Sequence, residues 1–149
     1  MDISWQDRHH SELSAQQLYA LLALRCAVFI VEQTCPYLDV DGQDLVADNR
    51  HILGMRGDEL VAYARILTPA DEAAPVAIGR VIVSASARGI NLGNRLMEQA
   101  LRSCERHWPA RGIYLSAQAH LQDFYGRLGF QAVGEIYLED NIPHIDMRK

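Results

Sequence analysis

The sequence predicts a single α/β (α+β) domain over residues 1–149, built on a mixed central sheet flanked by helices. Apolar runs typical of strands recur at residues 51–55, 60–67, 76–84 and 112–118. A helical pattern separates the last two runs, so we expect these two strands to pair in parallel through a helical crossover. At 149 residues, 49% of them hydrophobic, the chain is long enough for one domain with one core.

The N-terminal third is expected to contain a strand, a helix and a long loop. Residues 3–7 form a candidate first strand. Ser14 and Gln17 have the spacing of a helix capping box, and the apolar periodicity after them predicts a helix to about Val31. Residues 34–50 are rich in aspartate and lack any periodicity, which indicates a long loop of the kind that often carries function.

The remaining elements follow from turn residues and apolar runs. The strands at 51–55 and 60–67 flank a polar turn and predict a hairpin. The run at 76–84 is almost uniformly apolar, so we place it centrally in the sheet. Beyond it the chain predicts a helix from Leu92 that Pro109 limits, a second buried strand over 112–118, a short helix over 120–128 with Gly129 after it, and a final hairpin of 130–138 and 142–147.

Composition excludes several classes of protein. The net charge of −5 argues against binding to the phosphate backbone of nucleic acids. Three cysteines without metal-ligand spacing indicate reduced thiols. The first residues lack the basic and apolar segments of a signal peptide, and the apolar stretch from Leu18 to Val31 is interrupted by Arg25 and too short to cross a bilayer. We therefore expect a cytoplasmic protein with no nucleic-acid or membrane partner, and a homodimer is compatible with the sequence.

Residues 79–98 carry the pattern from which a phosphate cradle is built. The β-branched run 81–83 leads into Arg88-Gly89, and Gly93 opens an amphipathic helix. The first N–H groups of a helix have no partner within the helix, and the helix dipole favours an anion there. Neither a dinucleotide fingerprint nor a P-loop is present. The pattern therefore points to another phosphate-bearing cofactor.

Two motifs resemble the Gcn5-related N-acetyltransferase (GNAT) superfamily. The segment Arg88-Gly-Ile-Asn-Leu-Gly93 matches its acyl-CoA loop at both ends, with Asn91 where the family usually has glycine. Asparagine is among the residues that best tolerate a positive φ. The segment 121–130 resembles the family's second motif, with its tyrosine and Leu-Gly-Phe in register, and residues 24–44 are similar to the ElaA-like branch. The resemblance implies the GNAT fold, in which one parallel strand pair splays apart at the acyl-CoA site.

The resemblance also implies the residues that hold acetyl-CoA as co-substrate, with no metal. The CoA diphosphate would rest on the loop and the helix start, and the pantetheine arm would lie along the preceding strand. The expected cofactor-binding residues are Val81, Ile82, Val83, Arg88, Gly89, Ile90, Asn91, Leu92, Gly93, Asn94, Gln118, Phe124 and Tyr125.

Tyr125 is the candidate general acid. When an amine attacks a thioester the leaving group is a thiolate, which a nearby phenol can protonate. The alternative is a tyrosine that only packs its ring in the core.

The general base is left open. Many enzymes of the superfamily place a glutamate on the strand before the loop, and this strand has no carboxylate. The candidates are Glu32 and His51, with Asp41, Asp44 and His144 as further possibilities.

Arg80 lies inside an apolar strand, and Arg25 lies on an apolar helix. A buried arginine needs a partner, so each either binds an acceptor carboxylate or pairs with an aspartate of the loop, such as Asp41 or Asp44. The aspartates from Asp39 onward superficially resemble a calcium loop, but Arg50 stands where such a loop needs glutamate, so no metal site is expected.

These observations favour an N-acetyltransferase that transfers acetyl from acetyl-CoA to a small-molecule or peptide amine by direct attack in a ternary complex. Two alternatives remain: an enzyme similar to acyl-homoserine-lactone synthases, and an acyl-CoA-binding domain that senses without turnover.

Overall fold

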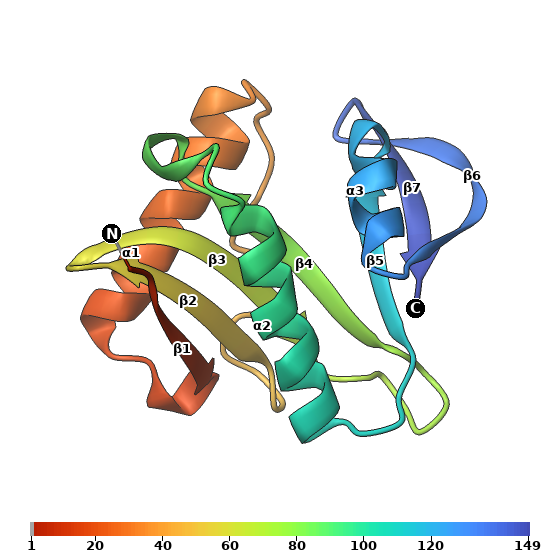
Figure 1. Cartoon of the computed structure of the whole chain (residues 1–149), viewed down its shortest axis with the longest axis horizontal. Helices are drawn as coiled ribbons and strands as arrows, with labels where there is room; N and C mark the ends of the chain where they lie inside the picture. The colour runs from red at the N-terminus through yellow and green to blue at the C-terminus, as the bar shows by residue number, and fades with distance from the viewer. Residues whose placement is uncertain (1) are drawn as a thin grey trace.

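A computed structural model describes residues 2–149 as one seven-stranded sheet with helices on both faces (Figure 1). The strand order is β1-β2-β3-β4-β5-β7-β6, and every neighbouring pair is antiparallel except β4 and β5. The strands are β1 Ser4–His9, β2 Arg50–Arg56, β3 Glu59–Leu67, β4 Val76–Val83, β5 Ile113–Gln118, β6 Gln131–Glu139 and β7 Ile142–Arg148. The predicted mixed sheet, its central strand and its parallel pair are confirmed.

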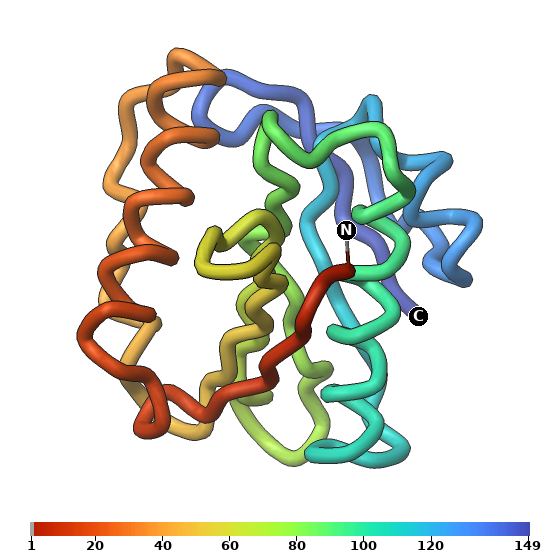
Figure 2. The backbone as a smooth tube through the Cα atoms, turned by 60° about the vertical axis from the view of Figure 1, so that its left-hand side comes forward, coloured from red at the N-terminus to blue at the C-terminus, as the bar shows by residue number. Residues whose placement is uncertain are grey.

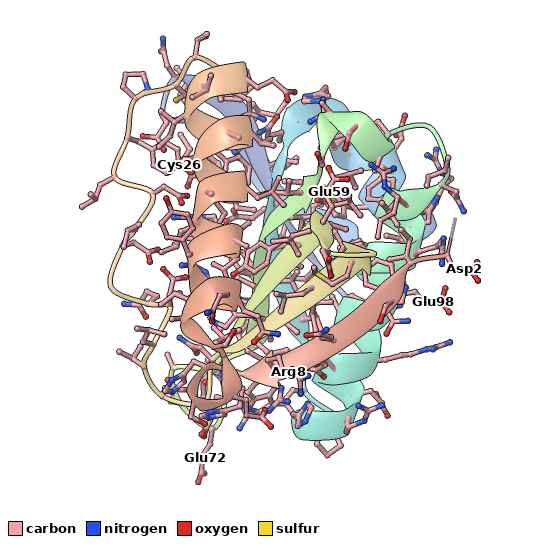
Figure 3. All side chains as sticks on the ribbon, turned by 90° about the vertical axis from the view of Figure 1, so that its left-hand side faces the viewer. Asp2, Arg8, Cys26, Glu59, Glu72 and Glu98 are labelled. Atoms are coloured by element: carbon pink, nitrogen blue, oxygen red, sulfur yellow. The ribbon has the colours of Figure 1, made fainter. Side chains whose placement is uncertain are left out.

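The helices lie on opposite faces of the first four strands (Figure 2). Helix α1 spans Ala15–Arg25 and continues as the π-helical segment η2, Cys26–Glu32. Helix α2 spans Leu92–His107 and covers the other face, and the short helix α3, Gln122–Arg127, packs beside β5 and β6. Figure 3 shows this arrangement edge-on, with Cys26 at the end of α1 on one side and Glu98 of α2 on the other.

The first helix begins as the sequence predicts and changes its hydrogen bonding near its end. The Ser14 hydroxyl accepts the N–H of Gln17, and the Gln17 side chain accepts the N–H of Ser14, both at 3.0 Å. The predicted helix to about Val31 is confirmed in its extent, and from Cys26 onward its turns widen to π geometry. Such wide turns recur near functional sites because they reorient the side chains that follow. Here the widened turns lead into the long loop 34–49.

Strands β4 and β5 pair over only two residue pairs, Val76 with Ile113 and Ala77 with Tyr114. Beyond them the strands diverge, as Figure 1 shows. On its other side β4 stays paired with β3, although the register shifts between Tyr63 and Arg65. Arg80 lies in this bulge with a φ of 52°, which is unusual for a residue with a side chain. The main chain of β4 beyond Ala77 therefore has no strand partner on its β5 side.

Two apolar clusters fix these layers. The larger lies between the sheet and helices α2 and α3, and its buried members include Leu96, Met97, Ala100, Leu115, Phe130 and Met147. The smaller lies between the sheet and α1–η2, where Leu21 and Val28 pack on Leu53, Tyr63 and Ile82. The sequence patterns of α2 and of the strands predict both faces.

The continuous helix Ala15–Glu32 is long and apolar enough to cross a membrane by length and composition alone. In this fold it packs on the sheet, because Leu21 and Val28 are buried in the smaller cluster. Arg25, in its middle, is fully buried and ion-paired, as described below. The helix therefore serves as one layer of the domain.

Gly54 of β2 provides a test of this packing. A Cβ at this position would lie 2.6 Å from Cζ3 of Trp5 and 3.0 Å from Cβ of Ala62. We expect Gly54→Ala to lower the free energy of unfolding by about 1–3 kcal/mol, because the indole must move within a packed face. Urea unfolding measures the change. Gly126→Ala is the matched control: nothing lies within 4 Å of its added Cβ, and we expect no loss of stability. Equal destabilisation of both variants would contradict this packing.

Candidate functional site

The predicted phosphate cradle forms a cavity of about 250 Å³ at the start of α2. Its lining is Val83, Arg88, Gly89, Asn91, Leu92, Gly93, Asn94 and Phe124, all of them among the residues expected to bind the cofactor. Asn91 has a φ of 60°, so it adopts the left-handed conformation that asparagine tolerates better than most residues. The Asn94 side chain donates a hydrogen bond to Oδ1 of Asn91, which ties the loop to the first turn of the helix.

The cradle presents unpaired main-chain N–H groups. Within residues 2–149 the N–H groups of Leu92, Gly93 and Asn94 donate to no other group, and the first helical hydrogen bond runs from Arg95 to the Asn91 carbonyl. Gly89 has a φ of 92°, and a Cβ there would meet nothing within 4 Å. Free donors at the positive end of a 16-residue helix suit a diphosphate.

The edge of β4 that leads away from the cradle is only partly free to pair with a ligand. Val83 lines the cradle, and Val81 lines a second, larger cavity between β4 and β5. The Ile82 side chain is buried under α1, so this residue offers only its main chain. The carbonyl of Val83 accepts a hydrogen bond of 3.0 Å from Nε of Arg88. A pantetheine amide that paired with this carbonyl would therefore have to displace Arg88. Ile90, also expected at the cofactor, is half-exposed and lines neither cavity.

A larger cavity of about 380 Å³ lies in the gap between β4 and β5. One wall comes from β4 and from the end of η2 with its following loop, and the other from β5, β7 and the turn between β6 and β7. Figure 2 shows this turn reaching across to the segment that follows η2. Phe124 lines the cradle and the adjacent Tyr125 lines the larger cavity, and their ring centroids are 5.0 Å apart. The two cavities are therefore neighbours along β4 and α3.

Tyr125 lies at this junction, and its side chain is almost completely buried. Its ring packs edge-on against Phe124 and Phe130. Within the described residues no group hydrogen-bonds its hydroxyl. Burial raises the pKa of Tyr125 to about 12, so the phenol keeps its proton at neutral pH. A protonated, unengaged hydroxyl in a cavity is what a general acid requires, and this role stays a prediction.

An ion-pair network supports one wall of the larger cavity, to which it contributes Arg65 of β3 and Arg80 of β4. Arg25, Arg65 and Arg80 meet Asp39, Asp41 and Asp44 of the long loop. Arg25 donates from Nε to Asp39 at 2.8 Å and from Nη1 to Asp44 at 2.5 Å. Arg80 donates from Nε to Asp39 at 2.9 Å. Arg25 and Arg80 therefore pair with aspartates of the loop, which is one of the two alternatives that the sequence left open. The sequence did not indicate that Asp39 and Arg65 also belong to this network.

The network lowers the pKa of two of its carboxylates, Asp41 and Asp44. Burial by itself opposes ionisation of Asp41, yet hydrogen bonds from Arg65 and from the Gln43 N–H outweigh it and lower the pKa of Asp41 to about 2. The same balance, with Arg25 as the main donor, lowers the pKa of Asp44. Neither carboxylate is thus available as a proton acceptor near neutral pH.

The structure places the two candidate bases away from the larger cavity. His51 is fully buried: its Nε2–H donates to the Asp44 carbonyl at 2.9 Å, and its Nδ1 accepts the Tyr63 hydroxyl at 2.6 Å. Burial lowers the pKa of His51. Glu32 forms a two-pronged ion pair with Arg88, at 2.7 and 3.1 Å, which lowers the pKa of Glu32. Neither residue lines the cavity.

The polar face of the C-terminal strands was missed by the sequence analysis. On β5, Leu115 and Ala117 are buried in the core. The alternate residues line the larger cavity and are only partly buried: Tyr114, Ser116 and Gln118. The prediction of a fully buried strand is therefore wrong for one of its two faces. On β7, His144 and Asp146 stand opposite Gln118 and Ser116. The alternation of polar and apolar residues over 114–118 and 144–147 is the signal that would have found this face.

Comparisons with known proteins identify the family of the chain. Residues 11–149 match the acetyltransferase (GNAT) domain family. The chain belongs to the GNAT acetyltransferase family. It is 63% identical over 147 residues to protein ElaA of Escherichia coli K12, and this alignment covers 99% of this chain and 96% of ElaA. The match extends to the crystal structure of E. coli ElaA, with a TM-score of 0.96, 61% identity and 99% of both chains covered.

Two further GNAT-fold structures are similar. The crystal structure of an acyl-CoA N-acyltransferase from Pseudomonas aeruginosa is 54% identical, with a TM-score of 0.96 and 99% of both chains covered. An aminoglycoside 6'-N-acetyltransferase complexed with coenzyme A shares the fold at 18% identity, with a TM-score of 0.73 and coverage of 100% of this chain and 96% of that one. The predicted fold and family are thus confirmed, and the chain is an acyltransferase of the GNAT type.

The burial of His51 predicts a pH dependence of stability. The folded-state pKa lies below the ordinary 6.5, so between these values the unfolded chain binds a proton that the folded chain excludes. Stability attributable to His51 is therefore fully present above pH 6.5 and decreases as pH falls below it, with a slope of up to about 1.4 kcal/mol per pH unit. Urea unfolding at several pH values measures this slope. We expect His51→Gln to reduce it and the exposed-site variant His120→Asn to leave it unchanged. An unchanged slope in His51→Gln would contradict the assignment.

Proposed function

We propose that the protein transfers an acetyl group from acetyl-CoA to a primary amine by direct attack in a ternary complex. The observation that carries the proposal is the pair of adjacent cavities at the divergence of β4 and β5. One has the free N–H donors that a diphosphate needs, and the other is a polar chamber large enough for an acceptor. They meet at Val81, Val83, Phe124 and Tyr125, so a thioester at this junction would be open to an acceptor from the other side.

Coenzyme A would be held mainly by main-chain groups. The N–H groups of residues 89–94 would bind the diphosphate, and Phe124 would form the floor of the cradle. The main chain of Val81, which has no strand partner towards β5, would pair with the pantetheine arm, and Gln118 closes the far side. When bound, the cofactor supplies the activated acetyl group.

Direct attack is favoured by the state of the cavity's thiol. Cys35 is the cysteine that lines the chamber, and its thiol donates to the Asp140 carbonyl at 3.1 Å. A buried thiol engaged in this way is poorly suited to carry a covalent acyl group. Tyr125 would protonate the leaving thiolate. Because acetyl-CoA is a metabolite of the cytoplasm, we propose that the protein acts there.

Replacement of the Tyr125 hydroxyl tests the acid. We expect Tyr125→Phe to lower kcat by about tenfold to a hundredfold, because the thiolate loses its proton donor. The Kd for acetyl-CoA should not change, because the ring keeps its packing. Thiol release with an amine acceptor measures kcat, and calorimetry measures Kd. Tyr19→Phe, at a residue that is 79% exposed, is the matched control.

Two outcomes contradict the proposal. Absence of detectable acetyl-CoA binding by the unmodified protein would exclude the cofactor. Micromolar binding, about −8 kcal/mol, without turnover of any amine would instead favour an acyl-CoA-binding domain.

A second test concerns Asn91 in the cradle. A β-branched residue at a φ of 60° is strained by roughly 1–2 kcal/mol, so Asn91→Val should distort the loop and weaken acetyl-CoA binding by about tenfold. Asn91→Gly tolerates the same conformation and should keep the affinity within about threefold. Calorimetric titration of both variants makes the comparison. Equal affinities would show that the cofactor does not depend on this loop.

A further inference from the structure

The larger cavity has an excess of negative charge once its buried network is accounted for. The arginines that line this cavity, Arg65 of β3 and Arg80 of β4, are already paired with aspartates of the loop. Arg25, Arg65 and Arg80 together balance Asp39, Asp41 and Asp44, so this network is neutral. No arginine of this wall is left over to bind an acceptor carboxylate.

The opposite wall carries carboxylates without a matching cation. Glu139 and Asp140 line the cavity at the end of β6 and in the following turn, and Asp146 of β7 accepts the hydroxyls of Tyr114 and Tyr137 at 2.8 and 2.6 Å. Within residues 2–149 no lysine or arginine forms an ion pair with any of these three carboxylates. An acceptor that enters here meets an acidic wall.

His144 provides a second and independent feature of this wall. It lines the cavity, yet the residue is only 8% exposed. Its Nδ1–H donates to the Ile142 carbonyl at 2.7 Å, which leaves the Nε2 lone pair free when the ring is neutral. Within the described residues Nε2 makes no hydrogen bond, and its nearest charged neighbour is Oε2 of Glu139 at 3.5 Å. A buried imidazole with a free lone pair beside a carboxylate is suited to accept a proton.

We propose that the acceptor is a cationic primary amine without a neighbouring carboxylate, which enters as an ammonium ion facing Glu139 and Asp140 and gives a proton to Nε2 of His144. This inference rests on the proposed acetyl transfer and adds the class of acceptor and the residue that deprotonates it. Glu139 lies close enough to stabilise the imidazolium that forms.

The step balances as follows. The ammonium N–H bond breaks and its proton passes to Nε2, which leaves a neutral amine and an imidazolium. The amine lone pair forms the N–C bond to the thioester carbonyl, and collapse of the adduct breaks the C–S bond. The sulfur takes the proton of Tyr125, the nitrogen returns its surplus proton to that phenolate, and His144 releases its proton to water. The products are the amide, free CoA and one proton.

Charged and titratable groups face His144 from the neighbouring elements. Glu139 and Tyr137 face it from β6, with the Tyr137 ring stacked at 6.2 Å, and Asp146 stands two residues away on β7. From β5 the opposite residue is Gln118, which carries no charge. Asp140 lies in the turn, and Arg65 and Arg80 line the far wall of the cavity. After the proton transfer the Glu139 carboxylate, 3.5 Å from Nε2, faces the imidazolium.

The test of the acceptor class compares two molecules that differ only in a carboxylate. Agmatine and arginine serve as the pair, with acetyl-CoA as donor and thiol release as the readout. We expect kcat/KM for agmatine to exceed that for arginine by at least about tenfold, since a carboxylate would face Glu139 and Asp140 without a free cation. Glu139→Gln should raise KM for agmatine by about threefold, a modest effect because this side chain is half-exposed.

The test of proton transfer uses His144→Asn. Its amide can still donate to the Ile142 carbonyl but has no atom at the position of Nε2. We expect kcat/KM to fall by about a hundredfold at neutral pH and the loss to shrink at high pH, where the amine is already neutral. His120→Asn, at an exposed histidine outside the cavity, is the matched control. Thermal unfolding of each variant shows that the fold is retained.

The outcomes separate the two proposals. Loss of acetyl-CoA binding in the unmodified protein would overturn the acetyltransferase function itself. Three results would overturn only this inference, provided that acetyl-CoA still binds normally. These are acetylation of arginine as fast as or faster than that of agmatine, no acetylation of agmatine, and an unchanged pH profile of kcat/KM in His144→Asn.

Discussion

The buried pairing of three arginines with three aspartates is the interaction on which the rest of the site depends. It joins α1, through Arg25, and the sheet, through Arg65 and Arg80, to a loop that has no regular secondary structure. Arg25, Arg65, Asp39 and Asp44 of this network are buried. Burial of a charge is costly, and the attraction offsets this cost only where each charge has several partners. Removal of one partner from such a network typically costs about 3–5 kcal/mol. The loop is therefore fixed by charge rather than by apolar packing.

The network also explains how β4 tolerates its irregularity. Arg80 lies in a bulge at a positive φ, a conformation that costs free energy for a residue with a Cβ. Its guanidinium is held by Asp39 and Asp41 and lies 5.7 Å from the centre of the Tyr37 ring. These contacts hold the side chain of Arg80 in place and offset the cost of its positive φ. The bulge lies just past the two residue pairs that join β4 to β5, where the strands diverge.

The two sides of the divergence have different chemistry. The side towards α2 presents main-chain N–H groups and suits a phosphate, whereas the side towards β7 presents carboxylates, phenols and an imidazole. Membership in the GNAT family accounts for the acyltransferase chemistry. In the proposal above, the acceptor is selected by side chains of the second side, such as Glu139 and His144.

Local sequence was sufficient for the elements and for the cradle. The capping box at Ser14 and the αL-tolerant Asn91 act within a few residues of themselves, so their patterns can be read directly. The type of the last helical turns at η2 was not predictable in this way, because seven residues are too few to distinguish the wider period of π turns from that of an α-helix.

Only the tertiary structure decided which charged groups meet. The pairing of Arg25 with Asp39 and the burial of His51 against Tyr63 join residues 12 or more positions apart, and several loop aspartates were equally plausible partners beforehand. The polar wall likewise depends on the pairing of β5 with β7, which α3 and β6 separate in the sequence. The sequence by itself thus determined the fold, the family and the loop before α2, because these rest on local periodicity and short motifs. Folding alone determined the larger cavity between β4 and β5, because its walls depend on long-range pairing of charges and strands.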